Sequence, residues 1–192
     1  MKARSASLPM CLGLAFWILL GGLRLIDGWQ NPRLIPLLLA VQSGLIAWRL
    51  STRREQVGEV RWSQKMVAWL SALLPLAMRI SEETMVGQAI TAVGLLLVLW
   101  SLSSLGDSFG IAPADRGLVE IGPYRLVRHP MYLGELVSLL GALISNLSTW
   151  NIVLIHVLLL CLLLRIHWEE QVVDNYRVYV RQVPWRMIPG IW

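Results

Sequence analysis

The chain reads Gly122-Pro123-Tyr124-Arg125-Leu126-Val127-Arg128-His129-Pro130-Met131-Tyr132-Leu133-Gly134 just where an apolar segment begins. Ionisable groups at a membrane boundary are costly unless they are paired or bind something. A second polar stretch, Arg165-Ile166-His167-Trp168-Glu169-Glu170, follows the last apolar segment. If the residues between the two stretches form a hairpin, both stretches meet at one membrane surface. This arrangement predicts a functional site there.

The intervening sequence favours such a hairpin. Pro130 suits the first turn of a helix, where a missing N–H is harmless. The connection Ser148-Thr149-Trp150-Asn151 is short enough to join two antiparallel helices and return Arg165 to the side of His129. We expect the second helix to continue as far as about Arg181, because no proline precedes Pro184 in this stretch.

The composition is typical of an integral membrane protein. Of the 192 residues, 56% are hydrophobic and 15% are charged, whereas charged residues make up about 25% of an ordinary soluble domain. Apolar stretches that approach the roughly 20 residues of a spanning helix cover residues 8–23, 34–50, 66–80, 85–105, 131–147 and 152–164. The predicted fold class is all-α, a polytopic membrane helical bundle with five or six transmembrane helices, a cytoplasmic loop and a C-terminal cytoplasmic helix.

The basic residues predict the orientation. If the N-terminus is cytoplasmic and all six segments span, only Arg24, Arg33 and Arg79 of the 17 Lys and Arg residues lie outside. This bias follows the positive-inside rule and puts both polar stretches and both termini in the cytoplasm. The net charge of +5 then reflects topology and contact with anionic lipid of the bilayer, so no nucleic-acid partner is predicted.

The motifs resemble those of the isoprenylcysteine carboxyl methyltransferase and phospholipid methyltransferase family of integral membrane enzymes. The matching residues are Gly122-Pro123-Tyr124-Arg125, Arg128 to Gly134, Arg165 with Glu169-Glu170, Tyr176, Tyr179 and Val183-Pro184-Trp185-Arg186. Residues 109–119 resemble the bacterial branch, which implies a bacterial inner (plasma) membrane. The resemblance divides the chain into N-terminal transmembrane helices, residues 1–105, and a catalytic region, residues 106–192.

The resemblance implies S-adenosylmethionine as methyl donor, bound on the cytoplasmic side. Glu169 and Glu170 are expected to contact its ammonium group or ribose hydroxyls. The implied lining of the cofactor pocket is Tyr124, His129, Tyr132, Tyr176 and the backbone near Gly134. No metal ligand is expected.

Arg128 and Arg165 are the predicted catalytic residues. A carboxylate acceptor is ionised at neutral pH and needs no general base, but a forked guanidinium can orient it. The implied acceptor is an amphiphilic or lipidated molecule, foremost the carboxylate of a prenylcysteine. Another lipid-like acid, a phenol or an amine stays open, and a phenol would require a base such as His129 or a glutamate.

Several alternatives compete with this hypothesis. In the first alternative, Arg165 and Glu169 form an ordinary i,i+4 ion pair at a helix end, and Arg128 extends toward lipid phosphate. A metal-dependent oxidase would use His129, His167 and Glu170, although three histidines in the chain are few for such a centre.

Two further alternatives keep the membrane fold. One is a sterol-reductase-like enzyme that uses NADPH. The other is a catalytically silent interaction module. Only Gln171 to Asn175 separate the paired glutamates from Tyr176, about one helical turn less than the family usually has, and this favours the silent module.

Overall fold

The computed structural model describes residues 8–79, 84–173 and 176–192. Within these ranges the chain is all-helical and contains no strand. The α-helices are α1 (Leu8–Gln30), α2 (Leu34–Thr52), α3 (Trp62–Leu73), α4 (Met85–Leu105), α5 (Pro130–Ser145), α6 (Thr149–Val172) and α7 (Tyr176–Gln182). The 3-10 helices are η1 (Leu74–Ala77), η2 (Gly106–Ser108) and η3 (Gly122–Arg125).

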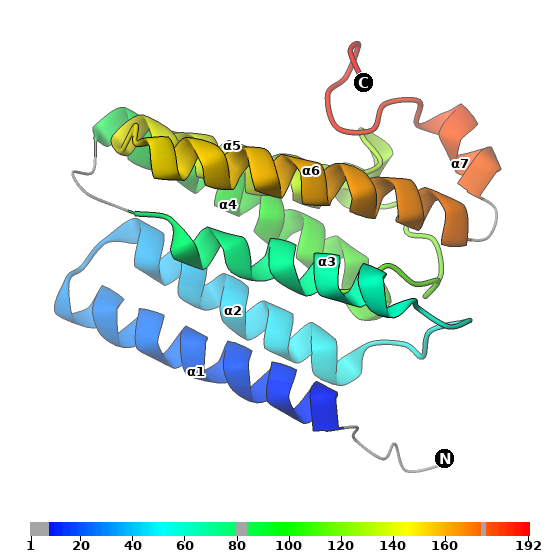
Figure 1. The fold of residues 1–192 in the computed structure, drawn as a ribbon, viewed down its shortest axis with the longest axis horizontal. Helices are drawn as coiled ribbons and strands as arrows, with labels where there is room; N and C mark the ends of the chain where they lie inside the picture. The colour runs from blue at the N-terminus through cyan, green and yellow to red at the C-terminus, as the bar shows by residue number, and fades with distance from the viewer. Residues whose placement is uncertain (1–7, 80–83, 174–175) are drawn as a thin grey trace.

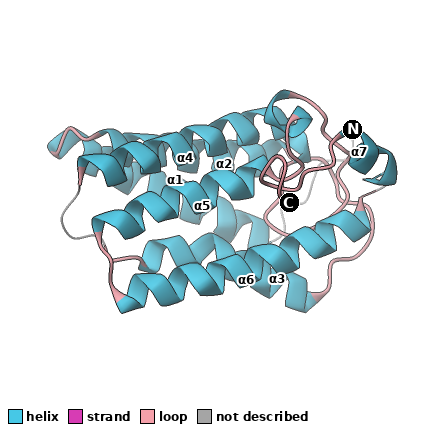
Figure 2. Cartoon of the chain, turned by 90° about the horizontal axis from the view of Figure 1, so that it is seen from above, coloured by secondary structure: helices cyan, strands magenta, loops and turns pink. Residues whose placement is uncertain are grey.

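The helices α1 to α6 run roughly along the long dimension of the molecule, and α7 lies at one end (Figure 1). The end of α2, the start of α3, the end of α6 and the chain's C-terminus all lie at that same end (Figure 1). The view from above also places α7 at the edge of the bundle (Figure 2). The two polar stretches of the sequence are therefore carried at one end of the bundle.

Four helices are long and apolar enough to cross a membrane: Met10–Gln30, Leu34–Thr52, Met85–Ser108 and Thr149–Val172. The helix α5 is a shorter apolar helix of 16 residues. Large apolar side chains are exposed along these helices, as expected of surfaces that face lipid. The predicted all-helical membrane bundle is confirmed, and the protein is an integral membrane protein.

One apolar stretch belongs to a longer helix than predicted, and another is divided between two helices. The stretch 152–164 belongs to the 24-residue helix α6. The stretch 66–80 is interrupted, because α3 ends at Leu73 and η1 follows. Pro75 has no N–H to continue the helical ladder, which explains the change.

The last long helix also ends earlier than predicted. It ends at Val172, and Val173 is extended, with φ −79° and ψ 125°. The prediction of one helix as far as Arg181 is therefore wrong. The β-branched pair Val172-Val173 precedes Asp174-Asn175 in the sequence, and all four residue types have low helix propensity. The helix α7 lies across the end of the bundle (Figure 1).

Small residues bring α4 and α5 into the most extensive helix contact of the described chain. A Cβ atom added to Gly94 would lie 2.3 Å from the backbone nitrogen of Ser138, and one added to Gly134 would lie 2.8 Å from the Gly94 oxygen. Thr91 Oγ1 donates to the Ser138 oxygen across the same contact, at 3.1 Å. Small residues allow this close approach in membrane bundles. The contact fixes the start of α5, which carries the first polar stretch.

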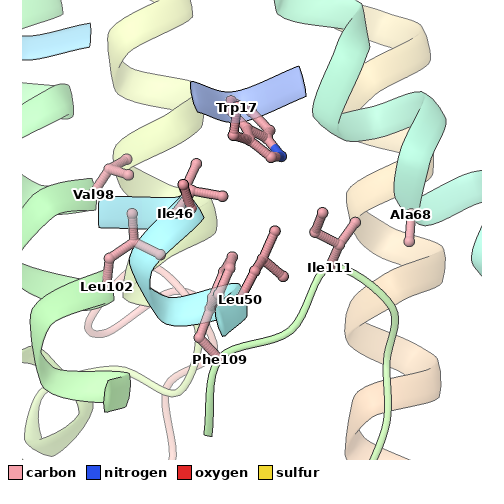
Figure 3. Close-up of a cluster of buried hydrophobic side chains, with 9 residues drawn as sticks. Trp17, Ile46, Leu50, Ala68, Val98, Leu102, Phe109 and Ile111 are labelled. Atoms are coloured by element: carbon pink, nitrogen blue, oxygen red, sulfur yellow. The ribbon is translucent and has the colours of Figure 1, made fainter. Parts of the chain in front are cut away.

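A buried apolar cluster anchors the loop after α4. Figure 3 shows Phe109 and Ile111 of this loop beside side chains of four helices. The cluster comprises Trp17, Ile46, Ala47, Leu50, Ala68, Val98, Leu102, Phe109 and Ile111. Two backbone hydrogen bonds join the α2–α3 loop to the loop after α4. The Arg54 N–H donates to the Asp107 oxygen at 2.7 Å, and the Val57 N–H donates to the Asp115 oxygen at 3.0 Å. The long loop is thus held against the bundle end.

Candidate active site

Glu170 lies among the side chains of two arginines and a tyrosine. Arg186 binds it in bidentate fashion, with Nε to Oε1 at 2.9 Å and Nη2 to Oε2 at 2.8 Å. Arg128 Nη1 lies 3.0 Å from Oε1, and the Tyr176 hydroxyl donates to Oε1 at 3.1 Å. A buried carboxylate is stable only with such partners. Glu170, in α6, therefore holds together the segment before α5, α7 and the C-terminal segment.

The C-terminal segment is also tied to the first polar stretch through its backbone. The N–H groups of Arg128 and His129 donate to the oxygens of Trp185, at 2.9 Å, and Arg186, at 2.8 Å. Arg128 Nη2 donates to the Pro184 oxygen at 3.2 Å. Residues 184–186 thus cover the entry to α5 and place Arg186 beside Glu170.

Glu169 has different partners from its neighbour. The Tyr132 hydroxyl donates to Oε1, and His129 Nδ1 lies 3.7 Å from Oε2. The rings of His129 and Tyr132 stack, with centroids 5.7 Å apart and planes at 9°. The Glu169 side chain is 25% exposed, against 13% for Glu170. Glu169 therefore keeps an accessible carboxylate edge for a ligand.

Arg165 is buried between α3 and the loop after α4. Its Nη1 donates to Ser71 Oγ at 2.9 Å, and its Nη2 donates to the Ile111 oxygen at 2.8 Å. The guanidinium lies 4.8 Å from the centre of the Tyr132 ring. Glu169 is only a distant partner, 3.9 Å from Nη2. The Nε atom has no hydrogen-bond partner among the described residues.

This geometry rules out a purely surface role for the two predicted arginines. Arg165 is 4% exposed and Arg128 is 8% exposed. An exposed i,i+4 ion pair and an arginine that extends into lipid headgroups would both be solvated. The i,i+4 pair of Arg165 and Glu169 is present, at 3.9 Å, but both arginines are buried, so burial argues against a role limited to the protein surface.

A cavity of about 770 Å³, including the part open to solvent, lies at this end of the bundle. We call it the polar cavity because it holds most of the charged and tyrosine side chains of the site, although apolar side chains also line it. Six predicted site residues line it: Tyr124, Arg128, His129, Tyr132, Glu169 and Tyr176. Tyr179 lines it as well, so all four tyrosines of the chain meet here. The loop after α4 contributes Phe109 and the stretch from Ala112 to Ala114. The hairpin thus brings the two polar stretches together as predicted.

Three predicted site residues lie elsewhere. Glu170 is next to the cavity wall and orders Arg128 and Tyr176. Gly134 faces α4, where its missing Cβ permits close helix contact. Arg165 lines a second cavity. Arg128 and Arg165 therefore line two different cavities.

The second, apolar cavity has about 1160 Å³, counted in the same way, and lies inside the bundle. Most of its lining is aliphatic, and its charged members are Arg24, Glu135 and Arg165. Phe109 and Met131 line both cavities. The two spaces are therefore neighbours, with these two side chains between them.

Arg116 lines the polar cavity and was not among the predicted site residues. It is 7% exposed and donates to the Ala112 oxygen at 3.3 Å and to Gln56 Oε1 at 3.1 Å. Burial lowers the pKa of Arg116 to about 10, which leaves it cationic at neutral pH. Arg116 lies within residues 109–119, which resemble the family, and this was the one feature of the sequence that could have identified it as a site residue.

Two further contributors were also missed. Arg186 was quoted only as part of a motif, and its hydrogen bond to Glu170 raises its pKa. The Tyr179 hydroxyl donates to the Tyr124 oxygen at 2.6 Å and joins α7 to η3. Partners of this kind come from distant segments, so spacing along one helix does not reveal them.

The phenols of the polar cavity are proton donors at neutral pH. Burial is the main cause that raises the pKa of Tyr124, Tyr176 and Tyr179. The negative charge of Glu170 adds to this effect at Tyr176. None of these three groups is therefore a phenolate base near pH 7.

His167 does not join His129. It is exposed, and its Nε2 lies 2.9 Å from Gln171 Nε2. Neither cavity has His167 in its lining. The spatial arrangement that the metal-oxidase alternative required, with His129 and His167 together, is not present.

Comparison with known families identifies the second half of the chain. No curated protein and no solved structure matches this chain. The family described as phospholipid methyltransferase matches residues 83–179, just over half of the chain. The match runs from the start of α4 to Tyr179 in α7 and includes both polar stretches. The chain therefore belongs to the phospholipid methyltransferase family of integral membrane methyltransferases.

Proposed function

We propose that this membrane methyltransferase uses S-adenosylmethionine to methylate the carboxylate of a lipid-like acceptor, foremost a prenylcysteine-type acid. The observation that carries the proposal is the pair of adjoining cavities, one polar and one apolar, that meet at Phe109 and Met131. A water-soluble methyl donor fits the first cavity. A greasy acid fits the second, with its reactive end toward the first.

The residues of the polar cavity suit the donor. S-adenosylmethionine supplies a methyl group bound to a positively charged sulfur and also carries a carboxylate, an ammonium group and ribose hydroxyls. Arg116 offers a buried cation whose Nε has no hydrogen-bond partner in the described chain. Glu169 offers an accessible carboxylate, and the aromatic rings of the wall favour a cation.

Arg165 is the residue we assign to the acceptor. It lines the apolar cavity, and its free Nε gives an acid something to bind. An ionised acid in an apolar space requires a cation, because an unpaired buried charge is strongly unfavourable. The surrounding aliphatic wall excludes water, which strengthens the attraction between the two charges. A phenol or an amine acceptor would lack this pairing.

Arg128 has a different role in the proposal. It lines the polar cavity while it binds Glu170 and the Pro184 oxygen. We assign it to hold the C-terminal segment and Glu170 in place around the donor. Its guanidinium also lies 5.6 Å from the centre of the Tyr176 ring, which fixes one wall.

The proposal places the polar cavity on the cytoplasmic side of a bacterial inner membrane. The donor is a cytosolic metabolite, and the polar cavity lies at the end of the bundle where most basic residues gather along the sequence. The acceptor enters from the bilayer.

The experiment measures two quantities on protein purified in detergent. One is binding of S-adenosylhomocysteine by calorimetry, with NADPH as comparison. The other is transfer of a tritiated methyl group to N-acetyl-S-farnesylcysteine. We expect binding of the homocysteine compound but not of NADPH, and transfer in the wild type. Arg165→Gln should lower transfer by at least about 100-fold, since a hydrogen-bonded charge pair in such a site contributes several kcal/mol.

Arg125→Gln is the matched control. Arg125 belongs to the same motif, is exposed and donates to the Glu120 oxygen. It should retain transfer. Binding without transfer to any lipid-like acid would favour the silent module, and binding of NADPH alone would favour the reductase. Full transfer in Arg165→Gln would remove its assigned role.

A further inference from the structure

Glu135 places a carboxyl group at the apolar cavity. Five positions of α5 line this cavity and recur at helical spacing along one face: Met131, Glu135, Ser138, Leu139 and Ala142. Glu135 therefore lies on the face of α5 that borders the cavity. A carboxyl group in an apolar space is costly unless it has a partner. Its presence there requires an explanation.

The described part of the protein does not supply that partner by direct contact. Among the described residues the carboxyl group of Glu135 makes no hydrogen bond and no ion pair. Its charge acts on Arg165, which lines the same cavity, but the Arg165 guanidinium donates to Ser71 and Ile111 instead. Two opposite charges thus border one apolar space without pairing directly.

Both charges lie close to the wall that the two cavities share. Met131 borders both cavities, and Glu135 follows one turn later, about 6 Å along α5. The Arg165 guanidinium lies 4.8 Å from the centre of the Tyr132 ring, and Tyr132 lines the polar cavity. The charge of Glu135 also acts on Tyr132. One small head group at this wall can therefore contact both Arg165 and Glu135.

A simple acid is a poor match for this pair of charges. Arg165 attracts its carboxylate, but an ionised Glu135 repels it, and this repulsion is stronger in an apolar space than in water. An N–H group beside the carboxylate reverses the second effect, because an ionised carboxylate only accepts hydrogen bonds. In an amino acid the nitrogen and the carboxylate are attached to one carbon, so each can face its own partner at the same time.

We infer that Glu135 binds an N–H group next to the acceptor's carboxylate, so that the acceptor is a lipid-like amino acid or its N-acyl derivative rather than a simple fatty acid. The inference rests on the proposed function for the position of the carboxylate at Arg165. Glu135 is thus a specificity-determining residue, while Arg165 holds the reacting group. An ammonium group and an amide N–H share this chemistry, and the test separates them.

The test is competitive binding to the purified protein in detergent with S-adenosylhomocysteine present. Displacement of tritiated N-acetyl-S-farnesylcysteine gives the affinities of three acids that share the farnesyl thioether and the carboxylate. N-acetyl-S-farnesylcysteine carries an amide N–H, S-farnesylcysteine carries an ammonium group, and 3-(farnesylthio)propionate carries no nitrogen. We expect at least one nitrogen-bearing acid to bind roughly ten- to 100-fold more tightly than the propionate, the typical effect of a hydrogen bond to a charged group.

Substitution of Glu135 should remove this preference. Glu135→Met takes away the carboxylate at similar size, so the nitrogen-bearing acids should bind more weakly, while the propionate should bind as well as before or better. Glu135→Gln keeps an oxygen that accepts from an amide but loses the charge that attracts an ammonium group. It should therefore retain more of the wild-type affinity for N-acetyl-S-farnesylcysteine than for S-farnesylcysteine.

Glu55→Met is the matched control. Glu55 is exposed in the α2–α3 loop and lines neither cavity. This variant should keep the wild-type order of affinities.

Equal affinities of the three acids in the wild type, or no binding of any of them, would overturn the inference. A preference that survives Glu135→Met would do the same, and so would an equal loss of affinity for all three acids in both Glu135 variants, which would assign the residue a structural role. A preference that depends on Glu135, without methyl transfer to any of these acids, would instead contradict the proposed function and leave the selectivity of the cavity intact.

Discussion

Glu169 and Glu170 are adjacent in sequence, but their surroundings divide their tasks. Glu170 accepts from Arg186 and Tyr176 and pairs with Arg128, so its oxygens are already occupied. Glu169 accepts from Tyr132 and remains the more exposed of the two. In the proposed function Glu170 is thus a positioning residue, and Glu169 is the one that contacts the donor.

Glu170→Gln should destabilise the protein and reduce transfer. The change keeps the size of the side chain but leaves the buried Arg128 without its negative partner. Removal of one member of a buried ion pair costs about 3–5 kcal/mol. We expect a clear fall in the thermal unfolding temperature in detergent and at least about tenfold less methyl transfer. Glu59→Gln, in the exposed α2–α3 loop, should change neither quantity, and an unaltered unfolding temperature in Glu170→Gln would contradict the role of this carboxylate.

The tyrosines predict an alkaline limit of stability. Burial raises the pKa of Tyr124, Tyr176 and Tyr179 above the ordinary value, which is about 10 in an unfolded chain. The folded state therefore keeps these protons at a pH where the unfolded state loses them. Its free energy of unfolding should be unaffected below about pH 10 and fall as the pH rises further.

Absorbance at 295 nm checks this prediction. Phenolate should stay nearly absent up to about pH 10 and then appear together with unfolding, followed by circular dichroism. Arg116 has the opposite effect on the free energy of unfolding, because its pKa is lowered to about 10 in the folded protein. The three tyrosines together should outweigh this single group. Gradual ionisation of several tyrosines in the folded protein near pH 10 would show that the phenols are accessible.

Residue-level prediction succeeded where regular helices determine which residues meet and failed where irregular segments do. The hairpin argument brought Arg128 and His129 to the paired glutamates, because apolar length and a short turn dictate antiparallel helices. Arg116 and Arg186 were not predicted as site residues. Their positions depend on how the loop after α4 and the C-terminal segment pack, and no periodicity describes such irregular chain.

At the scale of elements, the break between α6 and α7 lets Tyr176 reach Glu170 although few residues separate them. A continuous helix would carry Tyr176 and Tyr179 away from the bundle along its axis. Because α6 ends at Val172, the Tyr176 hydroxyl reaches Glu170 and the Tyr179 hydroxyl reaches η3. The short segment is therefore compatible with an assembled site. The end of α6 is thus explained by the weak helix propensity of the residues that follow, although no proline is present there.

The contact between α4 and α5 gives a test at this scale. A Cβ on Gly94 would lie 2.3 Å from backbone nitrogen and 2.6 Å from backbone oxygen of α5, so Gly94→Ala must push the helices apart. Overpacking of this kind costs about 1–3 kcal/mol. We expect a lower unfolding temperature and reduced transfer, because α5 carries Tyr132 into the polar cavity and begins directly after His129.

Gly44→Ala is the control for this change. Gly44 is also in a helix, α2, but an added Cβ has no described heavy atom within 4 Å. Alanine in a helix is then favoured by about 0.5–1 kcal/mol over glycine. Gly44→Ala should be as stable as the wild type or more stable. Equal behaviour of the two variants would mean that the α4–α5 contact does not limit stability.

At the scale of the whole molecule, hydropathy predicted the class of fold but not its interior. Apolar runs of nearly spanning length identify helices that face lipid on one side, whatever their order in space. They do not identify a cavity, since the side chains that line it, such as Leu39 and Leu95, are as apolar as those that face lipid. The two cavities and their shared wall at Phe109 and Met131 depend on how all the helices pack.

The distribution of charge predicts which way the molecule sits. The site end carries Arg49, paired with Asp107 at 3.9 Å, as well as Arg116, Arg128 and Arg186. The turn between α5 and α6 lies at the other end (Figure 1). Basic residues stay on the cytoplasmic side during insertion. The polar cavity should therefore face the cytoplasm, where the proposed donor is made, and the α5–α6 turn should face outward.

Cysteine labelling in intact bacterial cells measures this orientation. In a variant with Cys11 and Cys161 replaced by alanine, we expect a membrane-impermeant maleimide to label Ser148→Cys, in the α5–α6 turn, without lysis. Glu59→Cys, in the loop between α2 and α3, should be labelled only after the cells are opened. These two sites lie at opposite ends of the bundle, so each serves as the control for the other. The reverse pattern would place the polar cavity outside the cell, away from any supply of S-adenosylmethionine, and would contradict the proposed direction of donor entry.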